Sequence, residues 1–308
     1  MLTILTGGTG GAKLIEGLAA EIDPEGFTII CNTGDDCVFH GLHVSPDLDT
    51  VTYTLAGISD NTKGWGITGE SFTVLEQLGQ LGEPSWFKLG DKDLATHIMR
   101  SRLLNEGFQL TRITSELCDR LGVSAKILPM SDERVETRIC TPDGEISFQE
   151  YFVKERWSKP VTSIRFEGVE RSRPAPGVLE AIRQASAVVV CPSNPVTSIG
   201  PILAVPGIRA TLTQTTATVI AMSPIIGTSA ISGPAHRLMA AAGLEPSAFG
   251  VAQAYADFLD IFVIATEDEK MKSRIESLGI TTVLADVVMS DLAGKRRLAR
   301  EVLALLEE

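Results

Sequence analysis

The chain has 308 residues, of which 44% are hydrophobic, so it is long enough for one large or two ordinary domains with a substantial core. Its formal net charge of −12 argues against a nucleic-acid-binding surface, but a nucleotide substrate stays open because local lysines and backbone dipoles can hold phosphate in an acidic protein. No apolar run reaches the length of a membrane span, and the first predicted strand begins at Met1, so neither a membrane segment nor a secretory signal is expected.

The five cysteines are scattered along the chain, odd in number, and form no Cys-x-x-Cys motif. This usage suits the reducing cytosol and argues against structural zinc, so we expect a cytoplasmic protein. His40 and His43 lie three residues apart, but no neighbour completes a metal-ligand set, and we interpret both as ordinary loop residues.

A glycine-rich stretch follows the first apolar run, and it consists of Gly7, Gly8, Thr9, Gly10, Gly11, Ala12 and Lys13. We expect a strand at 1–6, a glycine turn with positive φ, and a helix that resumes at Leu14. In this arrangement backbone N–H groups and a helix N-terminus face an anion. The stretch is neither a Walker loop nor a full G-x-G-x-x-G, because Lys13 stands where the third glycine would be. A plain strand-to-helix turn is the alternative; we favour a phosphate cradle with Lys13 as a charge partner.

Two adjacent acids, Asp35 and Asp36, follow the second predicted strand at 27–31. An acid about 20 residues beyond a glycine turn could bind the ribose of a nicotinamide cofactor. Two acids directly behind a glycine could equally hold a metal ion, and both interpretations stay open.

A second pair of acids, Asp47 and Asp49, follows Pro46. In an extended segment the two carboxylates would share one side, where a cation or a hydroxyl donor would offset their repulsion. The alternative is that one of them caps the helix expected over 51–56. We favour a functional pair, because capping would explain only one of the two acids.

A loop and the helix behind it carry several charged residues. Asp93 is placed to cap this helix, and His97 and Arg100 share its face, either as a local ion-pair ladder or as part of a site. Lys88 lies in the approach loop, where helix pairing does not explain it, so we expect Lys88 to contact a ligand. Trp65, in an earlier glycine-containing loop, is a lid, a stacking surface or a packing residue.

The rest of the chain alternates strands and helices. Predicted strands cover 125–128, 187–191, 218–222, 261–265 and 281–285, and predicted helices cover 72–81, 114–121, 177–186, 270–278 and 291–306. A hairpin is predicted over 135–151, and the charged stretch 152–176 is interpreted as a crossing segment. We therefore expect one domain over 1–308: an α/β, Rossmann-like, doubly wound and mostly parallel sheet with an inserted hairpin and helical segment within 50–176.

Two loops follow predicted central strands. One contains Ser193 and Asn194; the other begins at Ser223 and includes Gly227, with Ser232 expected to open the next helix. Open α/β sheets bind ligands beyond the C-terminal ends of their strands, so both loops are candidates for ligand contact.

Taken together, six motifs resemble the 2-phospho-L-lactate transferase family (CofD/FbiA) of coenzyme F-420 biosynthesis. They are the glycine stretch 7–13, NTGDD at 32–36, PDLDT at 46–50, KLGDKD at 88–93, PSNP at 192–195 and SPIIG at 223–227. They occur in the family's order from the first predicted strand to the last helix. The glycine stretch is more similar to the bacterial than to the archaeal branch.

The resemblance implies a magnesium-dependent transfer. A guanosine-diphosphate-activated three-carbon acid gives its phospho-acid group to the terminal ribityl hydroxyl of the deazaflavin Fo, and GMP leaves. By the family's motifs, Asp49 and Lys88 contact Fo, and Asp49 is the candidate catalytic residue, as base or as metal ligand. The expected Mg²⁺ ligands are Asp35 and Asp49, with Asp36 and Asp47 as alternatives. The glycine stretch and the loops with Ser193, Asn194, Ser223 and Gly227 are expected to hold the guanine nucleotide. The resemblance also implies a homodimer.

Two other functions compete with this one. The gluconeogenesis-factor proteins are similar in their glycine loop and fold and bind UDP-sugars without catalysing a transfer; the motifs at 46–49 and 88–91 favour the transferase. A nicotinamide oxidoreductase is disfavoured by the incomplete glycine fingerprint. The donor acid, derived from 2-phospholactate, phosphoenolpyruvate or 3-phosphoglycerate, is left open by these residues.

Overall fold

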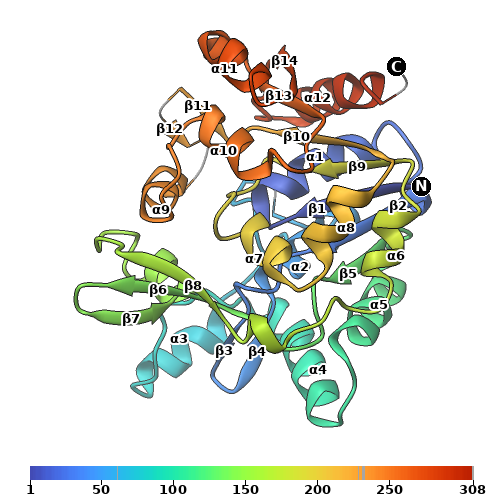
Figure 1. The fold of residues 1–308 in the computed structure, drawn as a ribbon. Coiled ribbons are helices and arrows are strands. Elements are labelled where there is room, and N and C mark those ends of the chain that lie inside the picture. Colours follow the sequence, from blue (N-terminus) through green and yellow to red (C-terminus); the bar gives the residue numbers. More distant parts are fainter. Residues whose placement is uncertain (61, 228, 231–232, 307–308) are drawn as a thin grey trace.

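Seven parallel strands form the central sheet of the computed structural model, which describes residues 1–60, 62–227, 229–230 and 233–306 (Figure 1). Their order is β14-β13-β10-β9-β1-β2-β5, with the bounds β1 (Leu2–Thr6), β2 (Phe27–Cys31), β5 (Lys126–Pro129), β9 (Ala187–Val190), β10 (Thr218–Met222), β13 (Ile261–Ala265) and β14 (Thr281–Ala285). From β1 the chain adds strands first on one side and then, from β9, on the other. The expected fold class is confirmed, and a crevice is left beyond the C-terminal ends of β1 and β9.

Helices cover both faces of this sheet. One face carries α1 (Thr9–Ala19), α2 (Pro46–Leu55), α5 (Leu110–Leu121) and α12 (Leu292–Ala304). The other carries α6 (Val178–Arg183), α7 (Ile199–Ala204), α8 (Ile208–Gln214), α9 (Ala235–Ala241), α10 (Ala248–Tyr255) and α11 (Lys272–Glu276). Neighbouring strand residues point to opposite faces, so Ile4 is buried with the first group and Leu5 with the second. The two cores therefore share one sheet.

Smaller elements stand outside these layers. They are α3 (Thr73–Gln80), α4 (Asp93–Asn105), the hairpins β3 (Cys37–Phe39) with β4 (Leu42–Val44) and β11 (Ile225–Ile226) with β12 (Ser229–Ala230), and an antiparallel sheet of β6 (Glu136–Thr141), β7 (Gly144–Ser147) and β8 (Ser163–Glu167). Short 3₁₀ turns lie at Pro24–Gly26, Val169–Arg171 and Thr266–Met271, and a π-helical turn at Glu150–Lys154. None of the helices in the described ranges is both long and apolar enough to cross a membrane.

Several expectations about elements were wrong. The stretch 152–176, expected to be a crossing segment, contains β8, and the stretch 199–214, for which no helix was expected, contains α7 and α8. The interval 50–176, expected to hold the insertion, also contains α5 and β5, which belong to the sheet and its covering layer. Ser232, expected to open a helix, lies outside the described residues.

The glycine stretch also differs from its expected form. Helix α1 begins at Thr9, so Gly10 and Gly11 lie in its first turn, and neither they nor Gly7 and Gly8 have a positive φ. Their role is close packing: a Cβ on Gly10 would lie 2.6 Å from the carbonyl oxygen of Pro192, and one on Gly11 would overlap Thr6 Oγ1. The glycines let the start of α1 sit directly against the ends of β1 and β9.

Candidate functional site

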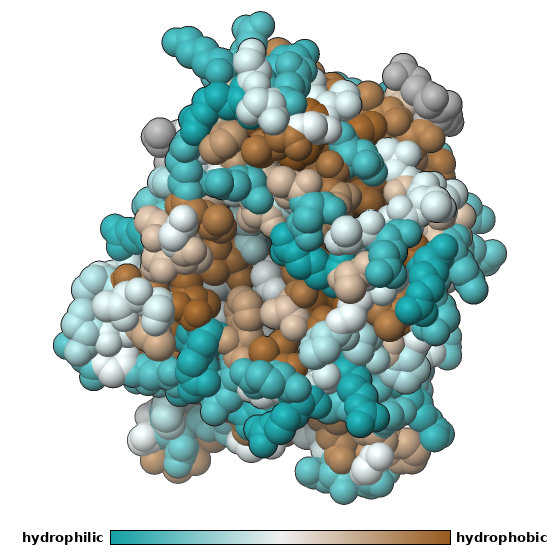
Figure 2. Space-filling model, viewed as in Figure 1, coloured by the Kyte–Doolittle hydropathy of each residue, from teal (hydrophilic) through white to brown (hydrophobic). Residues whose placement is uncertain are grey.

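A cavity of about 630 Å³ opens at the C-terminal ends of β1 and β9, on the crevice that the strand order creates. Its walls come from the start of α1, from α2, from the loops before α3 and α4, and from the segments around β7, α9 and the β14–α12 connection. Figure 2 shows hydrophobic residues gathered around a hollow on this face of the molecule. Cavities of this size accept a small-molecule ligand.

The start of α1 forms one end of this pocket, which Gly8, Thr9, Gly10 and Lys13 line. The first backbone N–H groups of a helix have no acceptor within the helix, and the helix dipole favours negative charge there. Lys13 has no acidic partner among the described residues, so its charge is available to a ligand. These features are suited to binding phosphate, and the predicted phosphate cradle stays a prediction.

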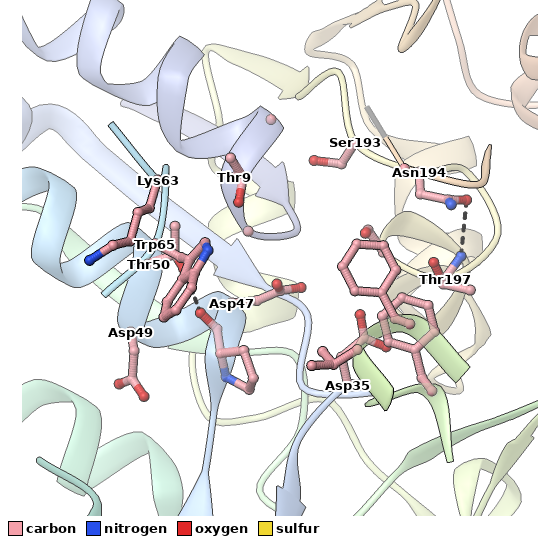
Figure 3. Close-up of a pocket in the computed structure, with 18 of the residues that line it drawn as sticks. Thr9, Asp35, Asp47, Asp49, Thr50, Lys63, Trp65, Ser193, Asn194 and Thr197 are labelled. Atoms are coloured by element: carbon pink, nitrogen blue, oxygen red, sulfur yellow. Dashed lines mark hydrogen bonds between the residues drawn. The ribbon is translucent and has the colours of Figure 1, made fainter. Parts of the chain in front are cut away.

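Ser193 and Asn194 face the same region from the β9–α7 loop (Figure 3). Ser193 Oγ accepts a hydrogen bond from the Gly7 N–H at 3.3 Å, which leaves its hydroxyl hydrogen free to donate. Asn194 Oδ1 accepts from the backbone N–H groups of Val196 and Thr197, so its amide hydrogens are also free. The loop therefore presents polar donors beside the helix N-terminus.

Asp47 lies against the glycine turn, close enough that a Cβ on Gly8 would overlap its Oδ1. Asn32 donates a hydrogen bond of 2.9 Å to Asp47 Oδ2 and fixes the carboxylate. Burial raises the pKa of Asp47 to about 7, although the hydrogen bond from Asn32 lowers it. Helix α2 starts at Pro46, so Asp47 lies within its first turn.

Asp35 is buried nearby, and its Oδ1 accepts no hydrogen bond within the described chain. Burial and then the charge of Asp47 raise the pKa of Asp35 well above its usual range. Figure 3 shows both carboxylates in the central part of the pocket. No lysine or arginine of the described residues forms an ion pair with either acid, so the pair lacks a compensating cation.

Asp36, the neighbour of Asp35, is engaged elsewhere. Its Oδ2 lies 2.9 Å from His43 Nε2 and accepts a hydrogen bond of 2.7 Å from Ser45. Asp36 does not line the cavity. These contacts hold the β3–β4 hairpin to the start of α2, which is a structural role.

Asp49 does not share a side with Asp47, because the segment is helical and residues two apart on a helix point in nearly opposite directions. The expectation of an extended pair was therefore wrong, and neither acid is the N-cap, which is Ser45. Asp49 turns toward α4, where Arg100 Nη1 donates to its Oδ2 at 3.0 Å and Arg100 Nη2 bonds Oδ1. Burial raises the pKa of Asp49, and the Arg100 and His97 contacts oppose this rise.

Lys88 lies in the loop before α4 and lines the same side of the cavity as Asp49. It is exposed, and it has no acidic partner among the described residues. The predicted pair of Asp49 and Lys88 therefore borders one cavity, although 39 positions separate the two in the printed sequence.

Four residues expected to bind nucleotide do not line the cavity. Gly7 and Gly11 pack behind it, against Ser198 and Thr6. The hydroxyl of Ser223 is buried and donates to the carbonyl oxygen of Ile225 at 2.9 Å. The N–H of Gly227 donates to the carboxylate of Asp268 at 3.0 and 3.1 Å. Ser223 and Gly227 shape the loop after β10 and have no polar group turned toward the cavity.

Several residues that line the cavity were not predicted from the sequence. Phe148, Phe152 and Trp157 form a run of aromatic rings on one side, with centroids 5.4 and 5.2 Å apart. Lys63, which lies 2.9 Å from Asp60, and the stretch 287–290 before α12 also line the cavity. The aromatic spacing in 148–157 was a usable signal, but nothing local indicates that 287–290 approaches the glycine turn.

A family model described as 2-phospho-L-lactate transferase CofD matches residues 2–303 of the chain. A protein of Streptomyces coelicolor named phosphoenolpyruvate transferase is 42% identical over 313 residues, covering 100% of this chain and 98% of the relative. A protein of Methanosarcina acetivorans named 2-phospho-L-lactate transferase is 42% identical over 306 residues, covering 99% of each.

Among solved structures, a member of the UPF0052 family from Bacillus halodurans has a TM-score of 0.65, with 98% of each chain covered and 19% sequence identity. At this identity the likeness concerns the fold, and it agrees with the Rossmann-like sheet described above.

Proposed function

The chain belongs to the 2-phospho-L-lactate transferase CofD family and is a transferase, and from this premise we propose its donor and acceptor. The donor is a guanosine-diphosphate-linked three-carbon acid. The acceptor is the terminal ribityl hydroxyl of the deazaflavin Fo, GMP is the leaving group, and the product belongs to coenzyme F-420 biosynthesis. The acid is 2-phospho-L-lactate, phosphoenolpyruvate or 3-phosphoglycerate.

One observation carries this proposal: a single cavity combines a phosphate-binding end with a separate carboxylate and lysine on another wall. At the first end, Gly8, Thr9, Gly10 and Lys13 would hold the diphosphate, with Ser193 and Asn194 donating to the nucleotide. At the other, Asp49 and Lys88 would hold the acceptor. Reaction between two bound substrates gains most from such fixed positioning.

The chemistry is attack of the ribityl hydroxyl on the phosphorus that carries the acid. A new O–P bond forms, the P–O bond to GMP breaks, and the hydroxyl proton passes to a base. Asp49 would orient the hydroxyl or accept this proton, while the α1 N-terminus and Lys13 would stabilise charge on the phosphates. The aromatic rings of Phe148, Phe152 and Trp157 would keep water from the reacting groups.

Asp35 and Asp47 fit a magnesium ion, because they are two oxygen donors without a cationic partner in the described chain and one oxygen of Asp35 is buried without a hydrogen bond. We propose this pair as the protein ligands, in place of the expected pair Asp35 and Asp49, since the Arg100 guanidinium already balances the charge of Asp49. When bound, the ion would neutralise phosphate charge.

The test is a coupled reaction followed by mass spectrometry. The protein is incubated with Fo, Mg²⁺, GTP, a guanylyltransferase and each of the three phospho-acids in turn. We expect a phospho-acid adduct of Fo, with release of GMP, from one of the three. Omitting Mg²⁺ should abolish the adduct.

No adduct from any acid, together with tight nucleotide binding, would instead support a regulatory protein of the gluconeogenesis-factor type. Calorimetry with GDP and UDP separates the two: the transferase requires a preference for GDP. The proposal extends to a cytoplasmic homodimer, which sedimentation of the purified protein and cell fractionation would check.

A further inference from the structure

Beneath the acceptor side of the cavity lies a buried arginine, Arg100 of α4, with a relative exposure of only 1%. Its guanidinium bonds both carboxylate oxygens of Asp49 in a bidentate contact. The Nε–H of Arg100 is buried and has no acceptor in the described chain. A buried ion pair whose polar groups are not all hydrogen-bonded contributes little net stability to the fold. The presence of this pair therefore indicates a role other than stabilisation.

His97 lies between Arg100 and Asp93 and contacts both. Arg100 Nη1 lies 3.4 Å from His97 Nδ1, and since a guanidinium can only donate, Nδ1 must be the acceptor. The ring hydrogen then sits on Nε2, which lies 3.1 Å from Asp93 Oδ2. The Arg100 contact thus favours the tautomer of His97 with its hydrogen on Nε2, which lies close to Asp93 without the geometry of a hydrogen bond.

The contacts close into a ring between two helices. Tyr53 donates a hydrogen bond of 2.6 Å to Asp93 Oδ1. Asp49 and Tyr53, four residues apart, belong to α2, while Asp93, His97 and Arg100 belong to α4. The ring therefore ties the helix that carries Asp49 to the helix that directly follows the Lys88 loop.

A metal ion is the obvious competitor for this cluster, because Asp49, Asp93 and His97 bring three ligand-type atoms within 4.8 Å of one another. Arg100 already bonds both oxygens of Asp49. The arginine therefore supplies the positive charge that an ion would otherwise bring.

We propose that Arg100 is a positioning residue of the transfer reaction, which holds the Asp49 carboxylate at one angle to the acceptor hydroxyl. A carboxylate has about four lone-pair directions; Arg100 uses two, and the remaining ones are left for the acceptor. Asp49 lines the cavity although it is only 5% exposed, so a small rotation would withdraw it from the substrate. This inference rests on the proposed function, with Asp49 as an acceptor-side residue.

The experiment is a double-mutant cycle of Arg100→Lys with Asp49→Asn, read as kcat/KM for Fo and as the dissociation constant of Fo. Lysine keeps the charge but loses the two-pronged geometry. We expect Arg100→Lys to lower kcat/KM by about 10- to 100-fold in the parent, as misplacement of a reacting group does. In the Asp49→Asn background it should change either readout less than about threefold, because a residue that acts through Asp49 has nothing left to position.

Arg209→Lys is the matched control. Arg209 grips both oxygens of Asp257 at 2.9 and 2.6 Å, outside the cavity, and this variant should keep the kinetic constants of the parent. If Arg100→Lys fails to fold, as judged by circular dichroism, Tyr53→Phe replaces it, since it removes one hydroxyl from the far end of the ring. It should lower kcat/KM about three- to tenfold in the parent and not in the Asp49→Asn background.

Two results would overturn the positioning role. One is an unchanged kcat/KM in Arg100→Lys, or in Tyr53→Phe where that variant replaces it. The other is an equal loss of kcat/KM in the parent and in Asp49→Asn, which a purely structural residue would give. Where Asp49→Asn is too slow to assay, the Fo dissociation constants of the single and double variants decide in the same way. Failure of the proposed function is a different outcome, because then the unmodified protein itself forms no adduct of Fo.

Discussion

At the scale of single residues, the two aspartates at the start of α2 differ in the groups that surround their carboxylates. Asp47 faces the glycine turn, with one amide donor and no cation, whereas Asp49 faces a guanidinium. Helical geometry alone sends the two side chains to different parts of the pocket. One turn of helix thus supplies a carboxylate to the proposed phosphate end of the pocket and another to the proposed acceptor end.

Replacing Asp49 with asparagine should remove most of the turnover and leave nucleotide binding intact, because the Asp49 carboxylate is bonded to Arg100 of α4 and not to the start of α1. Loss of a carboxylate that orients a hydroxyl or takes its proton costs roughly 10²- to 10⁴-fold in kcat. Steady-state kinetics with Fo and calorimetry with GDP would measure both. The control is Asp143→Asn at the exposed β6–β7 turn. A kcat within tenfold of the parent would remove Asp49 from the mechanism.

Asp47 predicts a pH dependence of stability without metal. Its pKa is about 7 in the folded protein and near the ordinary value of about 4 when unfolded, so between these values only the folded state holds the proton. The free energy of unfolding should therefore fall as the pH rises through this window. Asp47→Asn should make the fall smaller, with the raised pKa values of Asp35 and Asp49 accounting for the rest, and should be more stable than the parent at pH 8 by about 1–3 kcal/mol, the usual cost of an unsatisfied buried group.

Urea unfolding in EDTA at several pH values measures this difference. Added Mg²⁺ should stabilise the parent at pH 8 and affect Asp47→Asn much less, since one proposed ligand is gone. If the free energy of unfolding of the parent and of Asp47→Asn changed with pH in the same way, Asp47 would not carry a buried charge and the proposed Mg²⁺ site would lose its support.

At the scale of elements, α1 is held at its start and at a second point further along the helix. Its start packs on β1 and β9 through glycines, and its middle packs on α12, where a Cβ on Gly17 would overlap the carbonyl oxygen of Lys295. The Lys295 ammonium also reaches Glu16 at 2.5 Å. The phosphate-binding end of the pocket therefore depends on how closely α12 approaches α1.

Gly17→Ala tests this packing. In an open helix, alanine in place of glycine would stabilise by up to about 1 kcal/mol, but here the overlap with backbone should reverse the sign and cost about 1–3 kcal/mol. Gly26→Ala is the control, because a Cβ there meets no atom within 4 Å and φ is not positive. Urea unfolding of the two variants gives the comparison, and a stabilised Gly17→Ala would mean that the two helices can separate at little cost.

The seven central strands could be predicted because buried parallel strands are nearly continuous apolar runs, such as AVVV in β9. By contrast, β8 alternates exposed and partly buried residues in a charged stretch, α7 is short and contains a glycine and a proline, and α8 is short and follows a glycine, so their patterns were weak. Pro46 did mark the first residue of a helix, a signal that would have placed Asp47 and Asp49 correctly.

The pairing of Asp49 with Arg100 lay beyond prediction, because 51 positions separate them and nothing in one sequence records their contact. Asp93, His97 and Arg100 were recognised as one helix face, but their partner on α2 was not. Local patterns thus identified Asp49 and Lys88 as candidates that line the cavity, whereas the contact between Asp49 and Arg100 depends on how α4 packs against α2.

At the scale of the whole molecule, the pocket is assembled from both halves of the chain around one sheet. The first half gives the glycine turn, α2 and the Lys88 loop, and the second gives the loops after β9 and β14 (Figure 1). Val135, Ile139 and Tyr151 of the segment around β6 belong to the same buried cluster as the central strands. Because of this shared packing, we expect the sheet and the segments outside its covering layers to unfold as one cooperative unit.

All three tryptophans, Trp65, Trp86 and Trp157, lie in segments outside the central sheet and its covering helices. Most of the helices, by contrast, lie on the central sheet. Tryptophan fluorescence and far-ultraviolet circular dichroism therefore report different parts of one molecule during thermal unfolding. If the chain is a single domain, the two transitions should coincide, and GDP should raise both midpoints together. A fluorescence transition that comes first, or that GDP leaves in place, would mean that the segments bordering the acceptor side unfold independently and form a unit of their own.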